Sequence, residues 1–259
     1  PEMAGLVPRE RARWARLDHR LIGFPDAIIV PSEGRADEFA RRHSIARPSV
    51  VMNCPPAAPP PDPNASPLAA LRRAGEALLV YAGGYTQNRG LDNLVRAAPL
   101  VEGARLVMIG FGGAEAELRA LVDRERLGDR VLFHEPVAHD QVVSLVAGAD
   151  IGLAPYLPVG LNNQLAAPNK LFEYLHAGLA VAGSDLPDIR RVVETHRVGS
   201  VFDASEPASV ATAVRGMLAA PDELRAMRRR ALDAAPRYTW EAQAAVLVEI
   251  YEKLRSRAA

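Results

Sequence analysis

The chain has 259 residues, of which 49% are hydrophobic and 24% are charged, a balance typical of soluble globular proteins. Its 31 basic and 31 acidic residues cancel, so no overall positive charge favours binding to nucleic acid. A single cysteine excludes an internal disulfide, no apolar run has the length of a membrane-spanning helix, and the first residues lack the apolar core of a secretory signal. We therefore expect a cytoplasmic protein.

Short apolar runs rich in Val, Ile and Leu alternate along the chain with stretches of helical spacing. The predicted strands are Ala27–Val30, Val50–Met52, Leu78–Tyr81, Leu106–Ile109, Val131–Phe133, Ile151–Ala154, Leu179–Ala182 and Ser200–Phe202. The predicted helices between them are Gly34–Arg42, Leu91–Leu100, Glu115–Arg126, Gln141–Ala147, Leu171–Ala177 and Ile189–Thr195. This alternation predicts an α/β fold, a doubly wound parallel sheet with helices on both faces.

A proline-rich segment, Pro55–Pro67, interrupts the alternation. Seven of its 13 residues are proline, which neither donates a ladder hydrogen bond nor favours helix, so we expect a semi-rigid linker, with an ordinary surface loop as the alternative. The elements before it are too few for an independent doubly wound domain. We predict that residues 1–62 are the end of an N-terminal domain plus linker and that residues 63–236 form a Rossmann-like domain. Residues 237–259 are then a C-terminal helix, capped by Thr239, that packs back toward the N-terminal part.

Loops after the predicted strands are candidate ligand contacts, because ligands of an open parallel sheet bind beyond the carboxyl ends of its strands. In the first such loop, Gly83 and Gly84 let the backbone approach a ligand, and Tyr85 follows them. Arg89 stands before the next helix, where it is placed to neutralise a diphosphate. The alternative is a glycine turn with a solvated arginine.

The next two loops give weaker signals. Gly110 and Gly112 form a glycine-rich turn after a strand, but the third glycine of a dinucleotide-binding fingerprint is missing at Glu115. His134 begins the loop after the predicted strand Val131–Phe133, a strand on which a nucleobase is expected to stack or pair. A structural histidine is an equal alternative there.

The strongest segment is Ala167–Gly178. Proline in its first turn and glycine after its last predict a short helix, whose N-terminus favours a diphosphate. Asn169 and Glu173 are four residues apart and share a face, where the Glu173 carboxylate is suited to accept hydrogen bonds from the two ribose hydroxyls. Lys170 would offset phosphate charge as the bond to the leaving nucleotide breaks. The alternative is an amphipathic helix with a surface ion pair between Lys170 and Glu173.

These segments resemble the GT-B glycosyltransferases of the large retaining group 1, family 4. The similarity covers nearly the whole chain and includes Asp26–Ser32, Ser49–Asn53, Tyr81–Gly90, Ile109–Gly112, Ala149–Tyr156, Pro168–Gly178 and the terminal helix from Tyr238. The resemblance implies a donor site in the second domain, with Glu173 as the ribose-binding second glutamate of a Glu-x7-Glu motif and Arg89 in place of a lysine on the diphosphate. The first glutamate of that motif is replaced by Leu165, and Gly84 and Tyr85 stand where the family often has an arginine.

By this resemblance the chain is a hexosyltransferase-like enzyme, or its donor-binding portion. Its donor is a nucleotide-diphosphate sugar of the UDP or GDP type, used as a substrate, with no cofactor and no metal; its acceptor is an unidentified glycan, lipid or small molecule. Since most of the acceptor-side N-terminal domain is not in this sequence, we expect the chain alone to bind a donor better than it transfers a sugar, and to be inactive as a fragment.

Other interpretations stay open. A non-catalytic GT-B-like module that partners a complete transferase is the main alternative, and a nicotinamide-dependent oxidoreductase is disfavoured by the glycine spacing. A basic amphipathic helix near the start of the chain is compatible with peripheral contact with the inner face of the membrane, but a solvated face or an uncovered edge is the favoured explanation. Its arginines are Arg9, Arg13, Arg16 and Arg20, and its apolar residues are Trp14, Leu17 and Leu21.

Overall fold

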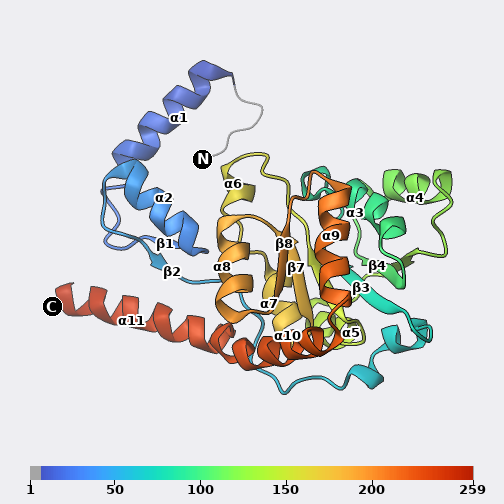
Figure 1. Ribbon diagram of the computed structural model, residues 1–259. Coiled ribbons are helices and arrows are strands. Elements are labelled where there is room, and N and C mark those ends of the chain that lie inside the picture. The colour runs from blue at the N-terminus through green and yellow to red at the C-terminus, as the bar shows by residue number, and fades with distance from the viewer. Residues whose placement is uncertain (1–6, 259) are drawn as a thin grey trace.

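The computed structural model describes residues 7–258 and shows a large α/β body beside a smaller lobe (Figure 1). Residues 1–6, part of the segment in which we expect no secretory signal, and residue 259 of the predicted C-terminal helix lie outside the described residues. None of the described helices combines the length and the apolar character needed to cross a membrane.

The large body is built on a six-stranded parallel sheet. Its strands are β3 (Ala77–Ala82), β4 (Ala104–Ile109), β5 (Val131–His134), β6 (Ile151–Ala154), β7 (Ala180–Ser184) and β8 (Gly199–Phe202). The strand order is β5-β4-β3-β6-β7-β8, so the chain runs outward from β3 and then returns to its other side at β6. This topology confirms the predicted doubly wound α/β fold.

Helices cover both faces of the sheet (Figure 1). One face carries α5 (Val142–Val146), α7 (Asn169–His176), α8 (Pro187–His196) and α10 (Pro221–Ala234). The other face carries α3 (Leu91–Ala97), α4 (Glu115–Arg124) and α9 (Pro207–Leu218). The short helix α6 (Leu161–Gln164) lies in the connection between β6 and α7.

Side chains of β3 show why the sheet needs two helical layers. Leu78 and Val80 belong to the core beneath α5 and α7, whereas Leu79 and Tyr81 belong to the core beneath α3 and α9. Successive residues of a strand point to opposite faces, so a strand that is apolar at every position must be buried on both.

The smaller lobe contains α1 (Pro8–Leu21), β1 (Ile29–Val30), α2 (Glu33–His43) and β2 (Ser49–Val50), with β1 and β2 paired in parallel. The last helix, α11 (Trp240–Ala258), leaves the large body and runs alongside this lobe (Figure 1). It is joined to the connecting segment by hydrogen bonds from the Trp240 N–H to the Pro55 carbonyl and from the Met52 N–H to the Gln243 side chain. The Thr239 hydroxyl accepts from the Ala242 N–H at 3.2 Å, which confirms the predicted cap.

Several elements differ in extent from the prediction. The predicted strand Val50–Met52 is Ser49–Val50, because the Met52 N–H bonds to Gln243 rather than to a strand. The proline-rich segment is not extended throughout: it includes the 3₁₀ helix Pro63–Ala65, capped by Asp62, and another begins at Pro67. Helices α6, α9 and α10 were not predicted, although a proline at the first position of both α9 and α10 is a signal for a helix start.

Candidate functional site

A pocket of about 610 Å³ opens where the chain reverses its direction across the sheet, beyond the carboxyl ends of β3 and β6. This is the position at which open α/β sheets bind ligands. Its lining comes from the loops after β3, β4, β5 and β6 and from the first turns of α7. The lining residues are Ala82, Gly83, Gly84, Arg89, Ile109, Gly110, Phe111, Pro136, Val137, His139, Val142, Tyr156, Pro168, Asn169, Lys170 and Glu173.

Two cations from different loops face this pocket. The guanidinium carbon of Arg89, after β3, lies 3.8 Å from the ring centroid of Tyr156, after β6. The Lys170 ammonium, on α7, lies 4.2 Å from the ring centroid of Tyr81 and 5.3 Å from that of Tyr156. Neither cation forms an ion pair with a carboxylate within the described residues. Their charges are therefore available to an anion in the pocket.

Lys170 is only 6% exposed. Burial, reinforced by the charge of Arg89 and opposed by that of Glu173, lowers the pKa of Lys170 to about 7. An added Cβ at Gly83, whose φ is +144°, would lie 2.8 Å from the Lys170 nitrogen, so a side chain there would displace the ammonium. The glycine after β3 thus makes room for a lysine as well as for a ligand.

Glu173 lies one turn further along α7 and is also only 6% exposed. Burial raises its pKa, while the charges of His139 and Lys170 oppose the shift. Among the described residues, the Glu173 carboxylate lies 3.5 Å from His139 Nδ1. The His139 side chain is itself 71% exposed. A buried carboxylate with so few partners is costly unless a ligand supplies hydrogen-bond donors.

Tyr174 fixes the orientation of α7. Its hydroxyl accepts from the Ala82 N–H at 3.0 Å and lies 3.1 Å from the Leu153 carbonyl, so it joins the ends of β3 and β6. An added Cβ at Gly152 would lie 2.4 Å from the Tyr174 ring, so this glycine provides the space for the ring. With Tyr174 and Leu171 directed to the sheet, Lys170 and Glu173 are left facing the pocket.

The structure brings together most of the residues predicted from sequence. Those that line the pocket are Gly83, Gly84, Arg89, Gly110, Asn169, Lys170 and Glu173. Tyr85, Gly112 and His134 do not line it. The Tyr85 side chain is buried between Tyr81 and Phe133, at ring-centroid distances of 6.2 and 6.3 Å, and His134 Nδ1 is 2.7 Å from the Glu135 carbonyl oxygen. The alternative surface ion pair between Lys170 and Glu173 is not among the ion pairs of the described residues, and both side chains are buried.

Sequence reasoning missed three pocket residues with distinct roles: Tyr156, His139 and Phe111. Tyr156 is the second residue after β6, and the rule that points to the loops after β3 and β4 points to this loop as well. Phe111 is 68% exposed between two glycines, an unusual position for a large apolar side chain. The approach of His139 to Glu173 depends on a turn, His139–Gln141, that no local pattern signalled.

Comparison with known proteins identifies the family. Residues 76–220 match the family model described as "Glycosyl transferases group 1". A D-inositol 3-phosphate glycosyltransferase of Xylanimonas cellulosilytica is 27% identical over 276 aligned residues, which cover 98% of this chain and 63% of that protein. The chain thus spans less than two thirds of this relative's length.

Solved structures show the same fold at low sequence identity. Sucrose-phosphate synthase of Thermosynechococcus elongatus superposes with a TM-score of 0.78 at 21% identity, over 99% of this chain and 64% of that one. The Anabaena protein Alr3699/HepE, in complex with UDP-glucose, has a TM-score of 0.72 at 18% identity, over 96% of this chain and 68% of that one. Because the family model covers more than half of the chain and the architecture agrees, the chain belongs to the group 1 glycosyltransferases of GT-B fold.

Proposed function

We propose that this chain binds a nucleotide-diphosphate sugar, of the UDP or GDP type, and supplies the donor half of a glycosyl transfer. The observation that carries the proposal is the convergence of Arg89, Lys170 and the Glu173 carboxylate on one pocket at the switch point of the sheet. Two cations suit a diphosphate, and a carboxylate about one helical turn away suits the vicinal hydroxyls of a ribose. The binding of UDP-glucose by the fold neighbour of Anabaena supports the same ligand class.

In this proposal the charge that develops on the leaving diphosphate is offset by protein groups. Arg89 and Lys170 approach from two loops, and the N-terminus of α7 adds the partial positive charge of its free N–H groups. Such a site can promote departure of the nucleotide without a metal ion. Transfer with retention of configuration is part of the proposal and rests on the family alone.

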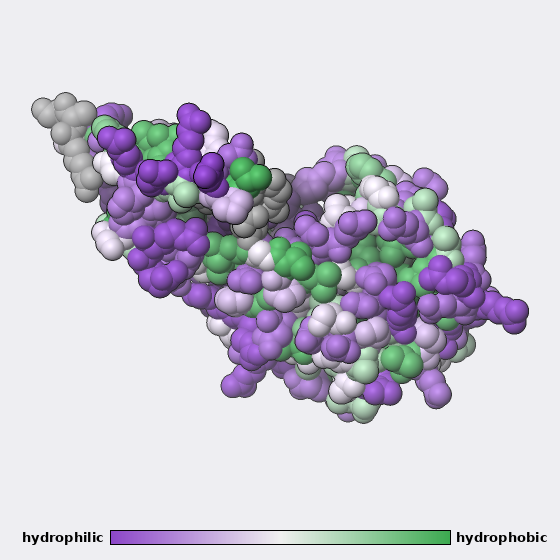
Figure 2. All heavy atoms as spheres, turned by 90° about the horizontal axis from the view of Figure 1, so that it is seen from above, coloured by the Kyte–Doolittle hydropathy of each residue, from purple (hydrophilic) through white to green (hydrophobic). Residues whose placement is uncertain are grey.

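The acceptor and the cellular location belong to the proposal as well. Four arginines of α1 are exposed on the smaller lobe together with Trp14, Leu17 and Leu21, and Figure 2 shows hydrophobic residues among hydrophilic ones there. These arginines are Arg9, Arg13, Arg16 and Arg20. A helix with this composition is suited to peripheral contact with an anionic membrane surface, and thus to a lipid-linked acceptor at its cytoplasmic face. Sedimentation with anionic vesicles, compared with Arg13→Glu, tests this part separately.

The donor proposal is tested by calorimetric titration with UDP, GDP and their sugar conjugates in the presence of EDTA. We expect binding of at least one diphosphate and weaker binding of the corresponding monophosphate, because the second phosphate completes the contact with the two cations. A folded protein that discriminates neither between diphosphate and monophosphate nor between ribose and deoxyribose would contradict the proposal.

A second candidate function, a non-catalytic module that partners a complete transferase, is favoured by one feature. Leu165 stands where the motif that resembles Glu-x7-Glu has its first glutamate, so a carboxylate contact to the donor sugar is missing. This candidate predicts nucleotide binding without donor hydrolysis or transfer, and activity only in a partner that co-purifies with the chain. Measuring hydrolysis of the bound UDP- or GDP-sugar separates the two.

A further inference from the structure

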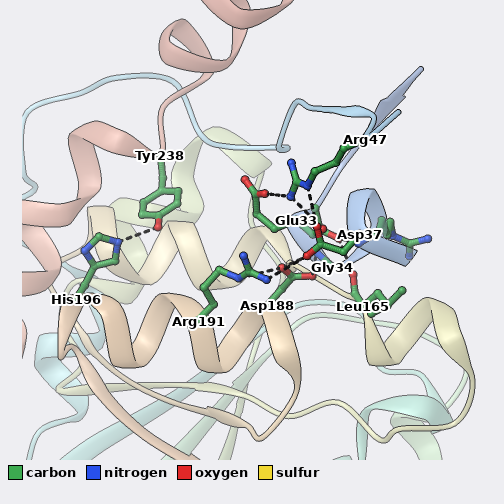
Figure 3. A network of polar contacts seen from close by, with 11 residues as sticks. Glu33, Gly34, Asp37, Arg47, Leu165, Asp188, Arg191, His196 and Tyr238 are labelled. Carbon is green, nitrogen blue, oxygen red and sulfur yellow. Dashed lines mark hydrogen bonds and ion pairs between the residues drawn. The ribbon is translucent and has the colours of Figure 1, made fainter. Parts of the chain in front are cut away.

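One buried carboxylate of the large body holds the start of α2 in the smaller lobe. Asp188, in the first turn of α8, is 3% exposed, and its two oxygens accept from the Gly34 N–H at 3.0 and 3.1 Å. Gly34 lies in the first turn of α2, so a single carboxylate serves the N-termini of two helices from different lobes. Figure 3 shows Asp188 directed at Gly34, with Leu165 beside them.

The packing at this junction leaves no spare volume. A Cβ added to Gly34 would lie 2.7 Å from an Asp188 oxygen and 3.1 Å from a methyl group of Leu165. Burial raises the pKa of Asp188, and the Gly34 N–H opposes the shift by bonding to the ionised form. The carboxylate is therefore stabilised in this position by the docked N-terminus of α2.

Once α2 is docked, its neighbours contact the connection between β6 and α7. The Ser32 hydroxyl donates to the Leu165 carbonyl at 2.8 Å, and the Arg35 guanidinium donates to the Asn162 carbonyl at 3.1 Å. Beyond this connection, the Asn53 amide donates to the Asn169 side chain at 3.0 Å, at the first residue of α7. The smaller lobe thus contacts residues 162–165, and the segment that follows the lobe contacts the start of the helix that carries Lys170 and Glu173.

The same connection is joined to the pocket from the inside. The buried Asn163 amide donates to the carbonyls of Asn88, at 3.0 Å, and Leu157, at 3.1 Å. The Leu157 N–H donates to the Asn88 carbonyl at 3.1 Å. Asn88 precedes Arg89, and Leu157 follows Tyr156. These bonds therefore fix the backbone next to the two residues that form the cation–π pair of the donor pocket.

We propose that Asp188 is a positioning residue for donor binding: by docking α2, it holds the β6–α7 connection and the start of α7 in the geometry that the nucleotide diphosphate requires. This inference rests on the donor site proposed above. Asp188 is outside the lining of the pocket. Its effect is transmitted through Ser32, Leu165 and Asn163, and not through the charge of Asp188 itself.

The test compares Asp188→Ala, Gly34→Ala and the double variant. We expect each single variant to lower the affinity for UDP or GDP about fivefold or more, the low end of coupling between sites. We expect the double variant to bind nucleotide no more weakly than the single variant with the lower affinity, because both substitutions break the same contact between Gly34 and Asp188. Hydrogen exchange of residues 157–168 should be faster in all three, with exchange in β3 and β4 unchanged.

Asp185→Ala is the matched control, because Asp185 lies in the same segment but is solvent-exposed and bonds to Arg190. It should keep wild-type affinity and wild-type exchange in residues 157–168. If an alanine variant does not fold, the isosteric Asp188→Asn, which keeps one acceptor oxygen, replaces it. This variant should show a smaller loss of nucleotide affinity and a smaller increase of hydrogen exchange in residues 157–168.

The outcomes separate this inference from the proposed function. Wild-type affinity in folded Asp188→Ala and Gly34→Ala, with the parent chain binding nucleotide, would overturn the role of Asp188 and leave the donor site intact. Failure of the folded parent chain to bind either nucleotide would overturn the proposed function and this role with it. Additive losses in the double variant would also contradict a single shared contact.

Discussion

The guanidinium of Arg89 stacks on the ring of Tyr156, 3.8 Å from its centroid, across the point where the chain reverses direction over the sheet. The two residues follow β3 and β6, neighbouring strands that are far apart in sequence. Tyr156 is nearly buried, and its ring also lies within 5.3 Å of the Lys170 ammonium. One aromatic ring therefore lies beside both cations that we assign to the diphosphate, and Tyr81 provides a second ring for Lys170, 4.2 Å from its ammonium.

Replacing Tyr156 by leucine should weaken nucleotide binding without removing any charge. Cation–π contacts are worth about 0.5–2 kcal/mol, so we expect affinity for a nucleoside diphosphate to fall roughly 2- to 30-fold. Tyr156→Phe, which keeps the ring, is the control and should bind like the parent chain. Equal losses in both variants, measured by calorimetry, would show that the hydroxyl matters and the ring does not.

Donor binding should take up a proton through Lys170. With a pKa of about 7, this lysine is mostly neutral at about pH 8, and a bound diphosphate favours its charged form. Titrations with a UDP- or GDP-sugar in two buffers of different ionisation enthalpy should therefore give different heats at pH 8, and similar heats below about pH 6, where the lysine is already charged.

Lys170→Arg is the control for this proton uptake, because a guanidinium stays charged at every pH used. Its binding heats should not depend on the buffer. If the parent chain also gives buffer-independent heats at pH 8 while binding the donor, Lys170 is not the group that meets the phosphates.

Glu173 should show opposite effects on stability and on binding. Burial raises the pKa of its carboxyl group, so ionisation of Glu173 costs stability, and that cost disappears as the pH falls through the raised pKa. We expect Glu173→Gln to raise the unfolding temperature. We expect the same variant to bind the ribonucleotide about 10- to 100-fold more weakly, because hydrogen bonds to a charged acceptor are lost.

Deoxyribonucleotides provide the control for this prediction. If Glu173 accepts from the ribose hydroxyls, the parent chain should prefer the ribonucleotide over its 2′-deoxy form, and Glu173→Gln should lose most of that preference. A variant that is less stable than the parent, with the preference intact, would point to a purely structural carboxylate.

We expect Phe111 to stack on the nucleobase of a bound donor. Its side chain is 68% exposed, and it lines the pocket from the loop after β4, as Pro136 and Val137 do from the next loop. Base–aromatic stacking is worth about 1–3 kcal/mol, so Phe111→Ala should lower nucleotide affinity about fivefold or more and leave the unfolding temperature unchanged. Phe24, 79% exposed on the smaller lobe, provides the control, and Phe24→Ala should change neither quantity.

The sequence predicted the layered fold because burial on both faces of a parallel sheet leaves continuous apolar runs such as Leu78–Tyr81. It also predicted the short helix α7, because Pro168 at its start and Gly178 after its end are signals for the two ends of a helix. The side-chain environment of the site residues was not predictable in the same way. The stacking of Arg89 on Tyr156 joins loops 67 residues apart in the chain, and only the strand order brings them together.

The contacts between the smaller lobe and the large body could likewise not be predicted from local sequence patterns, because they join residues far apart in the chain. In the sequence, Leu165 indicates only that a glutamate of the family motif is missing. In the structure, its backbone carbonyl accepts a hydrogen bond from the Ser32 hydroxyl. Asp188 lies in a predicted connection just before the helix Ile189–Thr195 and has the composition of an ordinary helix start. Its role depends on Gly34, 154 residues earlier, so no spacing rule within a segment signals it.

The most direct test of the donor site is a crystal structure of the chain soaked or co-crystallised with UDP or GDP. The account predicts a ribose within hydrogen-bonding distance of the Glu173 carboxylate and a diphosphate that contacts Arg89, Lys170 and the first turn of α7. A nucleotide bound elsewhere on the protein, or one in this pocket with its ribose turned away from Glu173, would contradict it.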